Sequence, residues 1–392
     1  MIEVSAEQIR NFRLCSHHLD RAYPESEAAA IVGACGIQNS PPGAWETALF
    51  NRVPSLSREQ MNGSLYQERD LIQAWSFRGA PVVFPVEESD VFLTALISRN
   101  GESWIYTPGI LTALDFLQMT FDELLESLEQ VMPQLDETVI TSKTALDQTL
   151  AEWMLPLIPA GKRDLWNRPS MYGNPEKQTV GGAVVSFLLR PCAFSGLVVF
   201  GERIGISPSF TSYKRWTGHP LISHEDAEKK LVRKFLHCYG PATADHFMGW
   251  LGCSRAQARR LWEAVSEEME PVKALGKKAY LLSEDRERIF SPPPIRRELL
   301  LLGAHDPYLD QRDRLVLQPE KGLHRQIWKL VGNPGAVVYR GEIIGTWTSR
   351  KKGKGMEIKM TLWAECGDKK KLKELAKERA EFLGEPLLRV EM

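Results

Sequence analysis

A short polar segment, Gln38-Asn39-Ser40, interrupts an apolar run and is followed at once by Pro41-Pro42. Amide and hydroxyl groups at such a break can hold a water molecule or a backbone group. The residue before a proline is restricted to extended conformations, so Ser40 cannot continue a helix. Pro41 suits the first turn of a new helix, with Ser40 as its N-cap. By itself the pattern favours a capped turn, which we call the elbow.

The common motifs of phosphate binding, metal-dependent hydrolysis and covalent catalysis are missing. The sequence has no Gly-rich phosphate loop, no HExxH, no GxSxG and no CxxC pair. Its eight histidines do not fall at metal-ligand spacing, and the neighbours His17 and His18 point different ways on a helix. The six cysteines are scattered along the sequence, a pattern typical of reduced thiols that pack in the core. We therefore expect no metal and no cofactor.

Two further polar clusters carry ionisable groups. His305-Asp306 and the run Asp310–Arg314 follow an apolar strand. This pattern favours a salt-bridged turn over the alternative, a buried acid directed into a cleft. The segment RKKGKG places four cations in a turn, where most such runs are solvated. A basic hairpin tip can also contact phosphate, here through Lys351, Lys352 and Lys354.

The elements that position these residues must form several units. A chain of 392 residues is too long for one ordinary core, and 43% apolar with 25% charged residues is typical of a soluble globular protein. The formal net charge is −1, so a nucleic-acid-binding surface must gather its basic residues on one face. The N-terminus has no apolar signal region and no run is long enough to span a membrane. We expect a cytoplasmic protein.

The first unit is expected over residues 1–115. Helical periodicity is followed by a strand, which is the element order of a winged helix. The last helix before the strand is expected to begin at Ser64, with Gln67 completing a capping box and with Ile72 and Trp75 on its apolar side. The expected elements are helices over Val4–Tyr23, Glu27–Ile37 and Ser40–Arg52 and from Ser64, and a strand over Pro81–Val86.

The second unit, residues 116–218, repeats this order. Helical periodicity over Phe121–Trp153 precedes a polar loop, then a helix over Ala183–Ala193 and a hairpin formed by LVVFG and RIGIS. The basic residues of the loop are Lys162, Arg163 and Arg168.

The third unit, residues 219–292, has the clearest pattern. Helices are expected over Asp226–Tyr239, Ala244–Leu251 and Ser254–Val265, followed by strands PVKAL and KAYLL. Arg255, Arg259 and Arg260 lie off the apolar stripe of the last helix. A helix-turn-helix with a β-wing and exposed arginines favours DNA binding over a generic helical hairpin with a solvated face.

The C-terminal unit, residues 293–392, follows a proline-rich linker. Its strands are expected in ELLLLG, RLVLQ, AVVYRGEIIGTWTS and MEIKMTLWA, before a helix over Lys369–Leu383. We expect a small β-barrel closed by the helix. The predicted fold is therefore α+β, with three tandem winged-helix units and a C-terminal β-barrel.

Several segments, in order along nearly the whole chain, resemble the bacterial winged-helix crosslink-repair DNA glycosylases of the AlkZ type. These are GIQNSPPGAWETALFNRV, LIQAWSFRGAPVVFP, YGPATADHFMGWLGCSRAQARRLW, LLGAHDPYLDQRDR and GEIIGTW. The resemblance implies tandem winged helices around a concave DNA-binding face. It also implies hydrolysis of the N-glycosidic bond of alkylated purines, including N7 adducts and crosslinks, in double-stranded DNA.

The family's motif on the elbow is Gln, any residue, then Gln or Asp. Gln38 matches the first position, whereas Ser40 takes the second and Val82 replaces a histidine that members often carry after the RG pair. The resemblance thus implies that Gln38 orients a water molecule with help from Ser40. Arg78 and the arginines of the third unit would hold the DNA backbone.

Three functions follow from these patterns. The first is a monofunctional DNA glycosylase, expected to be a monomer associated with the nucleoid. The second is a non-catalytic winged-helix DNA-binding protein, either a regulator or a lesion sensor. The third is a scaffold for protein contacts, since winged helices also bind proteins and the net charge is near zero.

Overall fold

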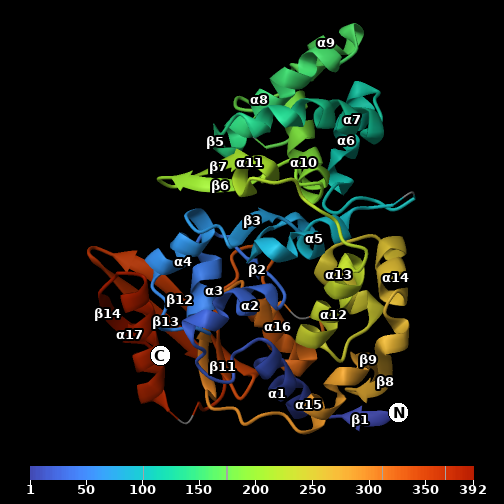
Figure 1. Cartoon of the computed structure of the whole chain (residues 1–392). Helices are drawn as coiled ribbons and strands as arrows, with labels where there is room; N and C mark the ends of the chain where they lie inside the picture. The colour runs from blue at the N-terminus through green and yellow to red at the C-terminus, as the bar shows by residue number, and fades with distance from the viewer. Residues whose placement is uncertain (100, 174, 311, 367) are drawn as a thin grey trace.

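Four separate sheets, each accompanied by its own helices, organise the chain in the computed structural model (Figure 1). The structure describes residues 1–99, 101–173, 175–310, 312–366 and 368–392. Three of the described sheets have three strands and the fourth has five, so the fold is mixed α+β. Within these residues no helix is both long and apolar enough to traverse a bilayer.

The N-terminal part of the chain holds the elbow between a short strand and a short helix. Its elements are β1 (Ile2–Val4), α1 (Ala6–Ser16), α2 (Ala28–Gly33), β2 (Ile37–Gln38), α3 (Ala44–Phe50), α4 (Arg58–Tyr66), β3 (Leu71–Trp75), β4 (Pro81–Pro85) and α5 (Ser89–Phe92). Strand β4 lies between β2 and β3 in one antiparallel sheet. The strand predicted over Pro81–Val86 is therefore confirmed.

The helix predicted from Ser64 is wrong in its position. Helix α4 begins at Arg58, and the side chains of its N-cap Ser57 and of Gln60 form the capping box. Ile72 and Trp75 belong to β3 instead. All five residues of β3 are buried, since the strand pairs with β4 on one edge and packs on both faces. A strand buried on both faces has no two-residue alternation, which explains why its apolar residues also fit a helical period.

The second group of elements stands at the top of Figure 1 and packs onto the first through Trp75. The Trp75 ring centroid lies 4.7 Å from that of Phe200 and 5.4 Å from that of Phe210. The predicted hairpin is present as β6–β7, and the predicted helix is α10. The elements are α6 (Leu111–Leu117), α7 (Phe121–Val131), β5 (Ile140–Thr141), α8 (Lys143–Met154), α9 (Arg163–Trp166), α10 (Val180–Phe194), β6 (Val199–Ile204), β7 (Ser207–Thr211) and α11 (Tyr213–Thr217).

The third group has the helices and hairpin that the sequence predicts. They are α12 (Ala227–Tyr239), α13 (Ala244–Leu251), α14 (Arg255–Glu263), β8 (Met269–Ala274) and β9 (Lys277–Leu282). A short helix that was not predicted, α15 (Arg286–Phe290), follows them. Strand β1 adds to this hairpin by pairing in parallel with β8. The N-terminal strand, which the sequence analysis did not predict, thus completes a sheet whose other strands lie more than 260 residues further along the chain.

The C-terminal unit is an open sheet, and the predicted β-barrel is wrong. Its elements are β10 (Leu299–Leu302), α16 (His324–Ile327), β11 (Gly335–Tyr339), β12 (Glu342–Lys352), β13 (Gly355–Leu362), α17 (Lys369–Phe382) and β14 (Leu387–Glu391). The strand order runs from β10 to β14, and these two strands form the edges. The expected strand RLVLQ is a 3₁₀ turn over Arg314–Val316 instead.

Both faces of this sheet are covered by other elements, so the sheet need not close into a barrel to bury its apolar residues. Helix α17 packs Leu372 and Ala376 against one face. Leu14 of α1 and Tyr308 cover the other face, where Leu300 and Leu302 of β10 point. A sheet buried on both sides can remain open, because helices take the place of further strands.

Candidate active site

Gln38 ends strand β2 and is fixed there by the sheet and by its neighbour. Gln38 is paired with Val82 of β4, and the Asn39 backbone N–H donates to the Pro81 carbonyl over 2.8 Å. The Asn39 amide donates to Gln73 Oε1 over 2.8 Å, and its Oδ1 accepts from the Gly43 N–H over 2.8 Å. Asn39 is buried and braces the turn, so the rigid elbow sets the direction of Gln38.

The elbow is not a helix cap at Ser40, which corrects the sequence prediction. Helix α3 begins only at Ala44, with Gly43 as its N-cap at φ +92°. This left-handed conformation favours glycine and cannot continue backward as a helix. The half-buried Ser40 contributes its carbonyl, which accepts from Gln38 Nε2 over 3.2 Å.

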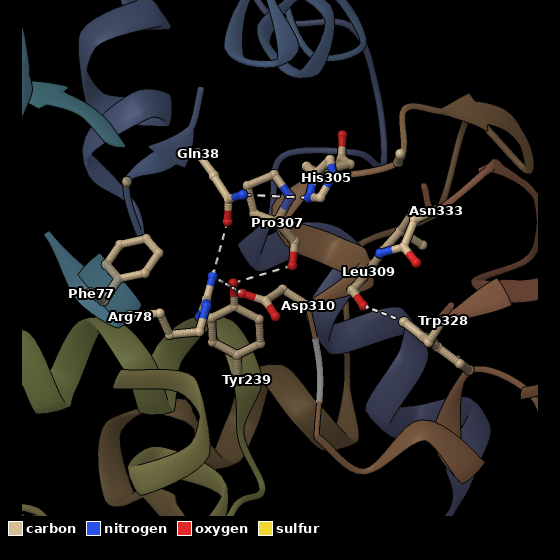
Figure 2. A pocket seen from close by; sticks show the side chains of 13 residues that line it. Gln38, Phe77, Arg78, Tyr239, His305, Pro307, Leu309, Asp310, Trp328 and Asn333 are labelled. Atoms are coloured by element: carbon tan, nitrogen blue, oxygen red, sulfur yellow. Dashed lines mark hydrogen bonds and ion pairs between the residues drawn. The ribbon is translucent and has the colours of Figure 1, made fainter. Parts of the chain in front are cut away.

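Gln38 faces a cavity of about 240 Å³ between the first, third and C-terminal units (Figure 2). Its walls combine aromatic rings with charged and amide groups. The residues that line it are Gly36, Gln38, Phe77, Arg78, Tyr239, Ala304, His305, Asp306, Pro307, Leu309, Asp310, Trp328 and Asn333. Ser40 is not among these described residues, so the two predicted catalytic residues do not share the cavity.

Both ends of the Gln38 amide have partners (Figure 2). Arg78 Nη2 donates to Gln38 Oε1 over 3.2 Å, and Gln38 Nε2 lies 3.4 Å from His305 Nδ1. The same Arg78 nitrogen is 2.6 Å from Asp310 Oδ2. An amide, an imidazole, a guanidinium and a carboxylate are thus linked in one polar network.

Arg78 is held in this network by an unusual backbone. Its φ of +56° lies in the left-handed region, which non-glycine residues adopt rarely and mostly where the surroundings enforce it. Its Nη1 donates to the Trp250 carbonyl at the end of α13 over 2.5 Å. Gly252 leaves the space for this contact, because a Cβ there would lie 2.9 Å from the Arg78 backbone.

His305 and Asp310 flank a turn that is anchored on both sides. Asp306 is buried and pairs with Arg52, with two N–O distances of 2.9 Å, and it caps the turn by accepting from the Tyr308 N–H over 3.0 Å. The Tyr239 hydroxyl donates to the Pro307 carbonyl over 3.1 Å. The salt-bridged turn predicted from this run is therefore present at Asp306; Gln311 of the run lies outside the described residues.

The electrostatics of the cavity keep His305 neutral. Burial lowers the pKa of His305; Asp310 opposes this shift and Arg78 adds to it. A neutral imidazole can accept a hydrogen bond through one nitrogen and donate through the other. The network around Gln38 therefore contains an acceptor that persists at neutral pH.

A second cavity, of about 400 Å³, begins beside the first and is lined by Pro41, Pro42 and Trp347. The two cavities share Ala304, His305, Asp306 and Asn333. Val82, at the position where related proteins often carry histidine, is buried in β4. In this chain an imidazole reaches Gln38 from a different element, the turn after β10.

Of the basic residues predicted to contact DNA, the structure brings Arg78 to Gln38. Helix α9, which includes Arg163, lies at the outer end of the second unit, far from β2 in Figure 1. Helix α14 and the β12–β13 hairpin lie on opposite sides of the molecule (Figure 1). The residues on or next to these three elements are Lys162, Arg163 and Arg168, then Arg255, Arg259 and Arg260, then Lys351, Lys352 and Lys354.

Several of these cations are engaged in ion pairs. Arg260 lies 2.8 Å from Glu102 and 2.6 Å from Glu228, and its side chain is only 22% exposed. Lys351 and Lys352 pair with Glu385 and Glu357. Arg255 and Arg259 keep 82% and 79% of their side-chain surface exposed, so they remain accessible to a phosphate.

Sequence reasoning missed His305, Asp310 and Tyr239 as parts of the cavity. The polar run after β10 was the available signal for His305 and Asp310. The alternative interpretation of this run was an acid directed into a cleft. Asp310, which lines the cavity, occupies a position of that kind. Tyr239 gave no comparable signal, since it ends an ordinary amphipathic helix.

Comparisons with known proteins agree with this arrangement. The family model described as DNA glycosylase AlkZ-like matches residues 31–384. The interstrand DNA cross-link repair glycosylase of Streptomyces sahachiroi is 24% identical over 360 residues, covering 88% of each chain. The solved structure of Streptomyces sahachiroi DNA glycosylase AlkZ has the same fold, with a TM-score of 0.77, 23% identity and 100% coverage of both chains.

The family match spans most of the chain and confirms the resemblance found in the sequence motifs. It favours a repair glycosylase over a non-catalytic DNA-binding protein. The chain belongs to the AlkZ-like family of DNA glycosylases, hydrolases that release a base by cleaving its N-glycosidic bond.

Proposed function

We propose that this protein is a monofunctional glycosylase that removes alkylated purines, N7 adducts and crosslinked bases from double-stranded DNA. The observation that carries the proposal is the position of Gln38: its amide lies in a cavity with Arg78 and His305 as partners at its two ends. In this proposal Gln38 orients the attacking water.

The chemistry needs little beyond such positioning. An N7-alkylated guanine is cationic and already a good leaving group, so the enzyme must place a water and stabilise an oxocarbenium-like sugar. Asp310 lines the same cavity and can supply the negative charge that the sugar requires. A serine hydroxyl is a poor base near neutral pH. We therefore assign the role expected of Ser40 to Asp310.

Direct hydrolysis suits the lining of the cavity. The described lining residues include no lysine that could form a Schiff base with the sugar. A glycosylase without such a nucleophile releases the base and leaves the DNA strand intact. This supports the monofunctional assignment.

The adjoining cavity offers room for a bulky substituent. It opens from the shared wall at His305 and has about 400 Å³. An adduct or the remnant of a crosslink could extend there while the base faces Gln38. The Streptomyces sahachiroi relative is named for interstrand cross-link repair, which supports the same substrate class.

DNA binding would use the helix–hairpin units as winged helices, with the protein acting as a monomer on the nucleoid in the cytoplasm. The exposed Arg255 and Arg259 of α14 suit contact with the phosphate backbone. The basic residues of α9 and of the β12–β13 hairpin would add contacts along a longer stretch of duplex.

The test is a glycosylase assay on duplex DNA that contains N7-methylguanine, with alkali used to cut the abasic sites. The wild-type protein should yield cleavage. Gln38→Ala should lower the excision rate by about 10²–10⁴-fold or more, while its affinity for the same duplex stays unchanged. Gln67→Ala, an exposed glutamine at the end of α4, is the matched control and should excise at the wild-type rate.

Two outcomes would contradict the proposal. Excision by Gln38→Ala at the wild-type rate would remove Gln38 from the chemistry. Binding without release of N7-methylguanine, of a bulkier N7 adduct or of a crosslinked base would favour the non-catalytic alternative.

A further inference from the structure

Three side chains that commonly bind metals converge in the interior behind the elbow. They are His17, Cys35 and Cys238, and one ligand atom from each lies within 4.8 Å of the others. They come from the end of α1, the turn after α2 and the last turn of α12. Their exposures are 2%, 3% and 0%, so the cluster is shielded from bulk water.

The ring nitrogens of His17 have no regular hydrogen-bond partner. Among the described residues neither nitrogen makes a hydrogen bond of ordinary geometry. Its ring packs edge-on against Tyr239 and Tyr308, with centroids 4.9 and 5.7 Å away. A buried polar group without a hydrogen-bond partner is unfavourable, so an unsatisfied imidazole beside two thiols suggests a ligand that is bound there.

Both thiols are free and lie close together. Among the described residues neither Cys35 nor Cys238 forms a disulfide, and the Cys238 sulfur lies 3.5 Å from the carbonyl oxygen of Ala34, the residue before Cys35. A thiolate is the form of cysteine that binds metals.

We propose that His17, Cys35 and Cys238 bind a zinc ion. Sulfur and imidazole nitrogen are the donors that Zn²⁺ prefers, and structural zinc sites are tetrahedral. Binding releases one proton from each thiol, and two thiolates with a neutral imidazole leave the ion with no net charge. These three side chains would supply three of the four positions of such a site.

Such an ion would brace the catalytic cavity from behind. Cys35 precedes Gln38 by three residues, and Cys238 is next to Tyr239, which lines the cavity. The zinc would therefore connect α1, the turn that leads to the elbow, and α12. The expectation of a metal-free protein rested on local spacing, and no local spacing links positions 17, 35 and 238.

The proposal is tested on the full chain produced in minimal medium with either Zn²⁺ or Co²⁺. Mass spectrometry should find one zinc ion per chain. The cobalt form should show the thiolate-to-metal charge-transfer band and the visible bands of tetrahedral cobalt. These readouts do not depend on glycosylase activity, so a failure of the proposed function leaves them intact.

Variants locate the ion. Cys35→Ala and Cys238→Ala should each lose the metal and the cobalt spectrum, and His17→Phe should lose them while it keeps an aromatic ring against Tyr239. Cys192→Ala removes an equally buried thiol in α10 and should keep the full metal content. Circular dichroism melting identifies any variant that fails to fold. The metal content is then compared among the variants that do fold.

Wild-type protein that contains no metal from either medium would overturn the proposal. Full metal content in both Cys35→Ala and Cys238→Ala would also overturn it. A disulfide between Cys35 and Cys238 in the purified protein, seen as resistance to alkylation, would do the same.

Discussion

The side-chain nitrogen of Gln38 lies 3.4 Å from Nδ1 of His305, a residue 267 positions further along the chain. Protonation of His305 would remove this acceptor and place a second cation beside Arg78. Burial lowers the pKa of His305 below its ordinary value of 6.5. The imidazole should therefore be mostly neutral at pH 6.5 and become mostly charged only in more acidic solution.

The pH dependence of excision should show this shift. The rate on N7-methylguanine should be level from pH 8 to about pH 6.5 and should fall only below it. His305→Gln keeps an amide beside Gln38 and cannot be protonated in this range. In this variant the excision rate should no longer fall in acidic solution. If the rate falls as it does in the wild-type protein, a group other than His305 causes the fall.

A comparison of Asp310→Asn with Ser40→Ala distinguishes the role of the carboxylate from that of the serine hydroxyl of the elbow. Loss of the negative charge should reduce the excision rate by about 10²–10⁴-fold, because the sugar cation loses its counter-charge. Ser40→Ala should change the rate far less, since Ser40 does not line the cavity. Single-turnover kinetics on the same duplex compare the two variants, with the exposed Asp115→Asn as a control.

A larger loss for Ser40→Ala than for Asp310→Asn would reverse this assignment. It would mean that the elbow rotates when DNA binds and brings the hydroxyl to the sugar. DNA affinity, measured by fluorescence anisotropy, should remain at the wild-type level in both variants.

The buried ion pair between Arg52 and Asp306 should dominate the stability of this region. Both side chains are almost inaccessible, at 2% and 0% exposure, and they make two contacts of 2.9 Å. Asp306→Ala should lower the free energy of unfolding by about 3–5 kcal/mol, because it leaves Arg52 buried without a counter-charge. Urea unfolding measures this change.

Asp310→Asn removes a partly exposed carboxylate and should cost much less stability than Asp306→Ala. A loss below ~1 kcal/mol for Asp306→Ala would show that water or another group reaches Arg52.

The arginines of α14 should differ in their contribution to DNA binding. Arg255→Ala should reduce the dependence of log affinity on log salt by about one, the change expected when one phosphate contact is lost. Arg260→Ala should leave this slope unchanged and lower thermal stability, since Arg260 is engaged with Glu102 and Glu228. Salt titrations of binding to an undamaged duplex compare the two, and equal slopes for both variants would contradict the distinction.

The features that the sequence predicts correctly are those encoded by local signals. Helix α13 has the predicted bounds, because a threonine cap and a glycine in the left-handed conformation mark its ends. The hairpins of the second and third units follow from their turns. The family resemblance singled out Gln38 as a catalytic residue and Arg78 as a DNA contact. Both line the cavity, and their roles stay predictions.

The errors arise where tertiary contacts decide the structure. Strand β3 is buried on both faces and therefore shows no alternation. The segment RLVLQ is apolar because Leu317 packs into the core beneath β10 and Val316 into the core between α1 and the β8–β9 hairpin, although their backbone is not a strand. Asp310 reaches the cavity because Arg52 anchors the turn through Asp306, a pairing across 254 residues that no local pattern reports.

The turn that carries His305 and Asp310 has a consequence for the protein during its synthesis. A ribosome that has translated the first three units holds a chain with the elbow, Arg78 and the two exposed arginines of α14, Arg255 and Arg259. Arg78 then lacks Asp310, and the amide of Gln38 lacks His305. With the roles proposed above, the nascent chain would carry its DNA contacts before its hydrolytic site, and the activity would require the last quarter of the polypeptide.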